Sequence, residues 1–227
     1  MKISVMLSSY NRPKYIQQAI ESVITQSHTD FELLILDDNS SFDIETLLDL
    51  YNDERIKLIK FLTSTEQRKS TLMMSQNINK GLTIATGDII SYLADDDYYF
   101  QNWFASINNF FENNHDKFVV YGKLHHEGHG YSSGIRFPTK LTTITGELDH
   151  NQVVHRKNAL LKLEKPYWPE DLASFGAPDG LFFRKLFANF TFDKIDCNAA
   201  TKRLHQKNLL YSQRDYEAGN DSIKIRE

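Results

Sequence analysis

Short apolar segments alternate with amphipathic segments in the first half of the chain, and this alternation limits the fold more than any other feature. Apolar runs of strand length occupy residues 2–7, 31–36, 56–61, 88–93 and 118–121. Three of them end abruptly in polar residues, as strands do where a loop begins. These runs predict strands that are separated by longer connecting segments.

The connecting segments have the 3.6-residue period of helices with one buried face. After Pro13, a residue suited to the first helical turn, Ile16, Ala19, Ile20 and Val23 share one face. The same period predicts helices at 43–51, 71–85 and 103–111. Because strands and helices alternate, we predict an α/β fold with a mostly parallel, doubly wound sheet and helices on both faces.

Beyond about residue 125 the alternation weakens, because glycines and serines interrupt it at 128–134. We expect an antiparallel addition to the sheet there, with a few further helices that include one at 179–188. No internal repeat or low-complexity linker divides the chain. We therefore predict that residues 1–227 form a single domain whose halves share one sheet.

Charge and cysteine content exclude several classes of function. The formal net charge is -4, and no stripe of Lys and Arg suits a nucleic acid or an anionic membrane surface. The single cysteine, Cys197, excludes an internal disulfide framework and fits a reducing compartment. No signal-peptide core and no apolar run of the roughly 20 residues of a membrane helix is present, so we expect a soluble, cytoplasmic protein.

Three polar clusters follow predicted strands, at 8–12, 37–40 and 95–97. Ligands of open α/β sheets bind beyond the carboxyl ends of the strands, so we expect the clusters to lie on one rim. Neither common glycine-rich phosphate loop is present. Consecutive carboxylates at Asp95, Asp96 and Asp97 contact phosphates only through a hard divalent cation, which predicts a metal-diphosphate site.

Each cluster also has a simpler interpretation. Residues 37–40 alone suit a turn or a helix cap, because Asp, Asn and Ser bond to nearby backbone amides. The acidic triplet alone suits a solvated loop or the start of a helix. The expected convergence of the clusters favours the functional interpretation.

The runs ISVMLSSYNR at 3–12, DDNS at 37–40 and GDIISYLADDD at 87–97 resemble family 2 glycosyltransferases. Among these, the likeness extends to spore-coat polysaccharide proteins. The resemblance covers about the first 125 residues and returns at 148–156 and around Asp179. It implies the GT-A fold, a Rossmann-like sheet with a smaller mixed or antiparallel C-terminal part. It also implies a nucleotide-binding half at 1–97 and an acceptor-binding half at 98–227.

The resemblance implies that five residues bind a nucleotide. Ser8 and Tyr10 would line the base pocket, with the Tyr10 ring packed on the base. Asp38 would accept the N3 proton of uracil or thymine, which cytosine lacks, so a UDP- or dTDP-sugar is implied as donor. Arg68 would contact the base, although an ordinary surface arginine is an equal alternative. Asp95 would meet the ribose.

Metal ligands for Mn²⁺ or Mg²⁺ are implied at Asp96, Asp97 and His205. Ala94 stands where many relatives carry the first acid of the motif, which leaves the division of roles within the triplet open. His205 lies in a polar stretch and is alternatively a solvated side chain.

A second group of possible metal ligands lies in a glycine-rich segment. Its members are His125, His126, Glu127 and His129. Glycines at 128 and 130 suggest a hairpin tip, where side chains need not converge, so we predict no zinc site there.

Asp179 resembles the general base of the family, which takes the proton of the acceptor hydroxyl. Its simpler interpretation is the N-cap of the following helix, and the two roles are compatible. With a cation as Lewis acid, a base here implies one in-line displacement that inverts the anomeric centre. Four residues, Asp149, His150, His155 and Trp168, are expected to line a donor-sugar or acceptor pocket. Arg203 is expected to reach the diphosphate.

These features predict a metal-dependent, inverting glycosyltransferase of polysaccharide or surface-glycan synthesis that uses a UDP- or dTDP-sugar and a hydroxyl acceptor. A sugar-phosphate nucleotidyltransferase is an alternative, but it normally has a glycine-rich basic loop that residues 8–12 do not supply. A glycosidase needs paired carboxylates but no nucleotide pocket. The non-enzymatic alternative is a relative that binds nucleotide or glycan without transfer, and the presence of Asp96 and Asp179 argues against it.

Overall fold

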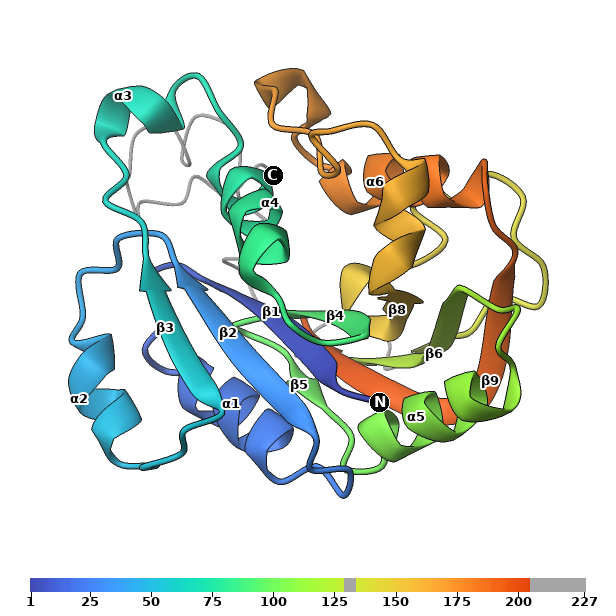
Figure 1. Cartoon of the computed structure of the whole chain (residues 1–227). Helices are drawn as coiled ribbons and strands as arrows, with labels where there is room; N and C mark the ends of the chain where they lie inside the picture. The colour runs from blue at the N-terminus through green and yellow to red at the C-terminus, as the bar shows by residue number, and fades with distance from the viewer. Residues whose placement is uncertain (129–133, 205–227) are drawn as a thin grey trace.

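The first half of the chain folds into four parallel strands. In the computed structural model, which describes residues 1–128 and 134–204, these are β1 (Ile3–Ser9), β2 (Phe31–Asp37), β3 (Ile56–Lys60) and β4 (Ile89–Ala94). They lie in the order β3-β2-β1-β4 (Figure 1). Each neighbouring pair is parallel, which confirms the prediction for this half.

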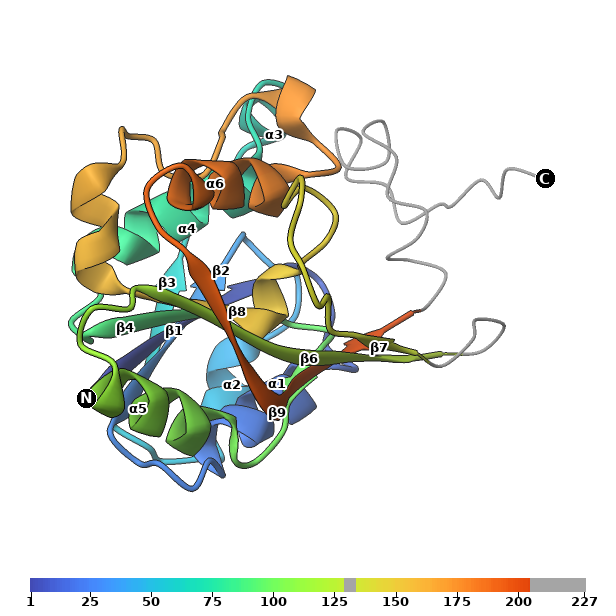
Figure 2. The same ribbon diagram turned by 90° about the vertical axis from the view of Figure 1, so that its right-hand side faces the viewer.

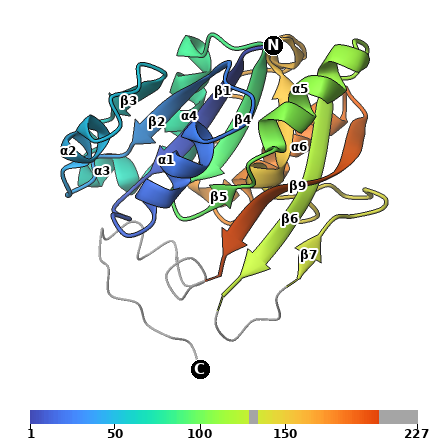
Figure 3. The ribbon, with the colours of Figure 1, turned by 90° about the horizontal axis from the view of Figure 1, so that it is seen from below.

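Helices cover both faces of the sheet. One face carries α1 (Ile16–Ile24), α2 (Ile44–Asp49) and α5 (Trp103–Asn113), and the other carries α4 (Met73–Ile84) and α6 (Pro178–Phe187) (Figures 1 and 3). The short α3 (Thr65–Arg68) follows β3. The apolar face predicted after Pro13 is buried in α1, as its spacing requires.

The second half extends the same sheet with mixed strand directions. β8 (Val153–Arg156) lies antiparallel between β4 and β6 (Val119–Glu127), and β9 (Phe192–Arg203) lies parallel to β6 (Figure 2). The two-residue strands β5 (Tyr98–Tyr99) and β7 (Ile135–Arg136) pair with β9 and β6 respectively. The described residues of this half also form three 3₁₀ helices, η1 (His150–Gln152), η2 (Lys157–Lys162) and η3 (Leu172–Ser174). The expected antiparallel addition is therefore present.

Apolar cores lie on both faces of the sheet. One core packs α1 and α5 against the sheet around Trp103, and the other packs α4 and α6 around Trp168. Neighbouring residues of β1 alternate between the two cores, with Val5 and Leu7 in the first and Met6 in the second. Burial on both faces explains why these strands are continuous apolar runs.

A buried carboxylate joins the amino-terminal edge of the parallel strands. Glu32 of β2 accepts hydrogen bonds from Ser4 Oγ of β1 (2.7 Å), Lys57 Nζ of β3 (2.8 Å) and the backbone N–H of Thr86 before β4 (2.6 Å). Its side chain is only 2% exposed. This contact fixes one edge of the sheet, while the carboxyl ends of the strands form the opposite edge.

Candidate active site

The carboxyl ends of β1, β2 and β4 are joined by hydrogen bonds. The N–H of Asp38 donates to the carbonyl of Ser9 (2.9 Å), and the N–H of Asp95 donates to the carbonyl of Ser8 (3.1 Å). The N–H of Tyr10 donates to Oδ2 of Asp95 (2.9 Å). The three polar clusters therefore meet on one rim, where the sequence places them.

A cavity of about 260 Å³ opens at this rim. Its lining includes four of the five residues expected to bind a nucleotide: Ser8, Tyr10, Asp38 and Asp95. Pro178, the first residue of α6, also lines it, so residues from both halves of the chain meet there.

Arg68 lies behind the cavity at the end of α3. Its guanidinium donates to Oδ2 and to the backbone carbonyl of Asp38, and lies 4.2 Å from the centre of the Tyr10 ring. Only 5% of Arg68 is exposed, so it is not an ordinary surface arginine. Burial raises the pKa of Asp38, while hydrogen bonds from Thr63 and Arg68 oppose this rise. One guanidinium thus fixes both Tyr10 and Asp38.

Arg12 pairs with two carboxylates of the acidic triplet. Its Nη1 lies 2.8 Å from Oδ1 of Asp95 and 3.1 Å from Oδ1 of Asp96. Burial raises the pKa of Asp95 to about 6; Arg12 opposes this rise and the charge of Asp96 adds to it. Because two buried carboxylates share one cation, the donor atoms and charge of this loop fit a divalent ion.

Asp97 has other partners than Asp95 and Asp96, and its expected role as a metal ligand stays a prediction. Its Oδ1 accepts the backbone N–H of Arg203 (2.7 Å), and its Oδ2 accepts the side-chain amide of Asn151 (2.7 Å). Burial, with the charge of Asp96 next, raises the pKa of Asp97 to about 8. Asp97 therefore joins the acidic loop to β9 and η1.

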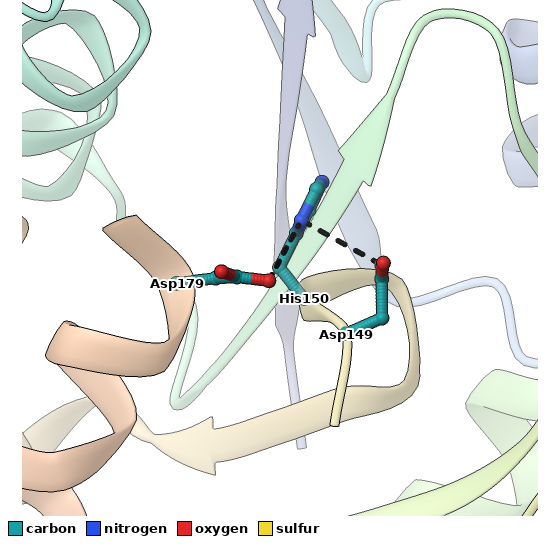
Figure 4. A group of neighbouring side chains, drawn as sticks. All are labelled: Asp149, His150 and Asp179. Atoms are coloured by element: carbon teal, nitrogen blue, oxygen red, sulfur yellow. Dashed lines mark ion pairs between the residues drawn. The ribbon is translucent and has the colours of Figure 1, made fainter. Parts of the chain in front are cut away.

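A second group of charged side chains comes from the other half of the chain. Figure 4 shows His150 between Asp149 and Asp179, with its Nδ1 lying 3.6 Å from Oδ1 of Asp149 and 3.8 Å from Oδ2 of Asp179. Lys202 of β9 pairs with Oδ2 of Asp149. Burial alone would lower the pKa of His150, but the charges of Asp149 and Asp179 outweigh it and raise that pKa.

The ligand atoms of Asp149, His150 and Asp179 lie within 4.8 Å of one another, so their chemistry also fits a metal ion. Asp149, however, already has Lys202 as its counter-ion, and the two donors of Asn151 also bond to it. Lys202 would therefore compete with a cation at this group.

Asp179 lies in the first turn of α6, directly after Pro178. The N-cap residue is Ala177, so the interpretation of Asp179 as an N-cap is wrong. Its Oδ1 accepts the N–H of Gly180 (2.8 Å), and its side chain is 23% exposed. The carboxylate is thus attached to a helix and accessible to solvent.

Trp168 and His155 do not line an open pocket, contrary to expectation. Both are fully buried. Trp168 stacks on Phe182 of α6 with ring centres 5.1 Å apart, and its ring lies 6.2 Å from that of His150. Burial lowers the pKa of His155 to about 4, and its Nε2 bonds to the hydroxyl of Tyr92 (2.8 Å). Trp168 therefore packs between His150 and α6 in the core.

Three other expectations concern the end of β9 and the glycine-rich segment. Arg203 Nη1 donates to the carbonyl of Asp96 (2.6 Å), which places it beside the acidic loop, and its contact with a diphosphate stays a prediction. His125 bonds to Asn198 through its Nε2 (2.8 Å). His129 and His205 lie outside the described residues.

Sequence reasoning missed three residues that organise the site: Arg12, Asn151 and Lys202. The sequence could have pointed to Arg12, because it is a cation in a loop expected to face three acids. It points less clearly to Asn151, which lies two residues after Asp149. No sequence feature points to Lys202, since only the folded sheet brings β9 next to η1.

Within residues 1–128 and 134–204, no helix has the length and apolar character needed to cross a membrane.

The fold and the site together define a class of protein. A β3-β2-β1-β4 sheet with a cavity beyond β1 and β4 and an acidic loop after β4 is typical of nucleotide-binding domains of the GT-A class. The model of glycosyl transferase family 2 matches residues 4–168, and the chain belongs to this family.

Individual relatives agree with this family. The chain is 32% identical over 200 residues to protein CgeD of Bacillus subtilis (strain 168), covering 84% of the chain and 47% of CgeD. It is 30% identical over 126 residues to an uncharacterized glycosyltransferase of Nostoc sp., covering 56% of the chain and 36% of the relative. The chain therefore spans less than half the length of either relative. The narrower likeness to spore-coat polysaccharide proteins is not shown by these matches.

A solved structure confirms the GT-A fold. The chain is similar to S. aureus TarS 1-349 in complex with UDP-GlcNAc, with a TM-score of 0.67 and 21% sequence identity. The match covers 91% of this chain and 59% of that one.

Proposed function

We propose that the chain is a metal-dependent, inverting glycosyltransferase that moves a sugar from a UDP- or dTDP-sugar to a hydroxyl acceptor. The observation that supports the proposal is a cavity at the carboxyl ends of the strands that is lined by Asp38 and Asp95 and by Pro178, the residue before Asp179. The likeness to TarS, which was solved with UDP-GlcNAc, supports a uridine diphosphate sugar as donor.

The base pocket supports a uracil or thymine base. The Asp38 carboxylate accepts the N3–H that these bases carry and cytosine lacks. Arg68 and Thr63 hold that carboxylate in place, so little reorientation is needed when a base arrives. The Tyr10 ring packs on the base, and Ser8 lines the same cavity.

The acidic loop supports binding of a diphosphate. Asp96 would hold Mg²⁺ or Mn²⁺, and Asp95 would meet the ribose. The cation would act as a Lewis acid that stabilises the negative charge of the leaving diphosphate. Arg12, which now pairs with both carboxylates, is close enough to the cavity to contact phosphate oxygens.

Asp179 is the proposed base. Its carboxylate takes the proton of the acceptor hydroxyl while the oxygen of that hydroxyl bonds to the anomeric carbon. The bond from the anomeric carbon to the diphosphate breaks in the same displacement, which inverts the anomeric centre. The acceptor is a glycan or another hydroxyl compound, as in polysaccharide or surface-glycan synthesis.

Calorimetry with UDP, with and without Mn²⁺, tests the binding half of the proposal. We expect Mn²⁺ to tighten UDP binding by at least about tenfold in the parent protein, because the ion links Asp96 to the phosphates. This gain should disappear in Asp96→Asn. Glu164→Gln, a change at an exposed acid, is the control. UDP affinity that is indifferent to both Mn²⁺ and Asp96→Asn would contradict the proposal.

Release of UDP from a panel of nucleotide sugars, measured with Mn²⁺ present, tests the transfer half. Slow donor hydrolysis or transfer to an added glycan would support a glycosyltransferase. A protein that binds UDP with Mn²⁺ but releases none from any donor would be a binding protein without transfer activity.

A further inference from the structure

The carboxylate of Asp179 has a partner at each of its oxygens. Oδ1 accepts the N–H of Gly180 within α6 (2.8 Å), and Oδ2 forms an ion pair with Nδ1 of His150 at 3.8 Å (Figure 4). The hydrogen bond and the ion pair both favour this orientation of the carboxylate. The contact with His150 is the one that comes from outside the helix.

His150 is itself held against the helix that carries Asp179. Its side chain is 13% exposed, and its ring meets Trp168 edge to face, with an interplanar angle of 79°. Trp168 stacks on Phe182, which lies one turn after Asp179 on α6. The imidazole therefore contacts an aromatic pair that includes a residue of α6, the helix that carries Asp179.

The charges around His150 orient its Nδ1 edge toward acids. Asp149 lies in its own segment, Asp179 faces it from α6, and Lys202 approaches from β9. Lys202 pairs with Asp149, and Asn151 also bonds to Asp149, so that acid has two partners besides His150. His150 is the residue from outside α6 that forms an ion pair with Asp179.

We propose that His150 is a positioning residue that holds Oδ2 of Asp179 in the direction from which it takes the proton of the acceptor. The inference rests on the proposed function, in which Asp179 is the base. His150 touches no reacting atom in this scheme and acts only through Asp179. Its effect should fall on turnover and should leave nucleotide binding unchanged.

Two substitutions of His150 separate the donor atom from the bulk of the ring. His150→Asn keeps an N–H donor close to the position of Nδ1, whereas His150→Leu removes it. We expect His150→Leu to lower turnover at saturating donor about 10- to 100-fold, the range expected when a reacting group is misplaced. His150→Asn should retain most of the turnover, and both variants should bind UDP with Mn²⁺ as the parent does. His115→Leu, at an exposed histidine, is the control.

A double-mutant cycle with Asp179→Asn gives the decisive comparison. If His150 acts only through Asp179, then His150→Leu should change the residual turnover of Asp179→Asn less than about twofold. An equal loss in both backgrounds would overturn the inference. Equal losses in His150→Asn and His150→Leu, together with weaker UDP binding, would mean a merely structural role and would also overturn it.

The same experiment separates this inference from the proposed function. Normal turnover in His150→Leu would overturn the inference alone. A parent protein that binds UDP but turns over no donor would overturn the proposed function, and the positioning role with it.

Discussion

At the scale of single residues, charge balance in the acidic loop decides what the site accepts. Asp95 and Asp96 are both nearly inaccessible to water, and each lies within 3.1 Å of Arg12 Nη1. The guanidinium of Arg12 thus lies where a cation bound to these carboxylates would have to come close to it. Under the proposed function, Arg12 would compete with that cation.

Removal of Arg12 should reveal this competition. We expect Arg12→Gln to bind Mn²⁺ about fivefold more tightly than the parent when no nucleotide is present, because a nearby positive charge is lost. Calorimetric titration with Mn²⁺ measures the change. Arg184→Gln, at an exposed arginine of α6, is the matched control and should leave the affinity unchanged. Weaker Mn²⁺ binding in Arg12→Gln would show that Arg12 organises the loop and does not compete for it.

The base assignment predicts a split between binding and turnover. Asp179→Asn keeps the size and the hydrogen bond from Gly180 but cannot accept a proton, so transfer should fall by at least about 10²-fold. UDP binding with Mn²⁺ should stay near normal. Steady-state transfer rates and calorimetry on the same preparation measure both quantities. Comparable transfer by mutant and parent would remove Asp179 from the mechanism.

Sequence reasoning placed some of these residues well and others poorly, for a physical reason. Ser8 lies at the end of β1, and Tyr10 and Asp38 directly follow β1 and β2, so their place on the rim follows from the topology alone. Asp97 and Trp168 are also close to the site in sequence, but their side chains turn into the interior. Which way a side chain turns depends on partners from distant segments, and a single sequence does not reveal these.

At the scale of elements, one buried acid joins the parallel strands at the edge opposite the site. Burial alone would raise the pKa of Glu32, but hydrogen bonds from Lys57, Ser4 and Thr86 outweigh it and lower that pKa to about 2. These three partners belong to β3, to β1 and to the turn before β4. Glu32 thus links the strands whose far ends carry the nucleotide pocket.

Glu32→Gln should destabilise the fold by about 1–3 kcal/mol at pH 7, because buried donors lose their charged acceptor. The pKa of Glu32 is lower in the folded chain than in the unfolded one, so its ionised form stabilises the protein above about pH 4.5. That contribution is lost as the pH falls from about 4.5 toward 2. Urea unfolding at pH 7 and pH 3 measures the free energy of unfolding at each pH. Its decrease between pH 7 and pH 3 should be smaller in Glu32→Gln than in the parent.

Glu164→Gln, at an exposed acid, is the control for this measurement and should unfold as the parent does. If the free energy of unfolding decreased equally in Glu32→Gln and in the parent between pH 7 and pH 3, the pH dependence would come from other groups.

The elements that sequence patterns located least well are those of the second half. β6 continues six residues past its predicted end at 121, because its polar residues 125–127 still pair with β7 and β9. β9 carries polar residues at most positions and has no apolar run to mark it. Such strands form because neighbouring strands are already in place, and a local pattern does not record this.

At the scale of the whole molecule, the first and second halves of the chain share one sheet. β8 lies between β4 and β6, so the halves are hydrogen-bonded to each other along a strand. Each face of the sheet has its own core, with Trp103 in one and Trp168 in the other. This arrangement favours a single cooperative unit.

Unfolding should therefore be one transition for both faces. Two variants each keep one of the two tryptophans of the chain. Trp103→Phe leaves Trp168, whose fluorescence reports the core beneath α4 and α6. Trp168→Phe leaves Trp103, whose fluorescence reports the core beneath α1 and α5. For each variant we expect the urea midpoint from tryptophan fluorescence to equal that from far-UV circular dichroism. Midpoints that separate within one variant would indicate two independently unfolding parts.

The reversed direction of β8 has a consequence for how a protein of this kind changes its substrate. Because β8 runs against β4, the segment that enters β8 arrives at the rim where β4 ends. Asp149 and His150 lie in this entering segment, just before β8 begins. The segment can become longer, shorter or different in sequence without shifting the register of β8 against β4 and β6. Under the proposed function, such a change would alter the choice of acceptor and leave the donor site as it is.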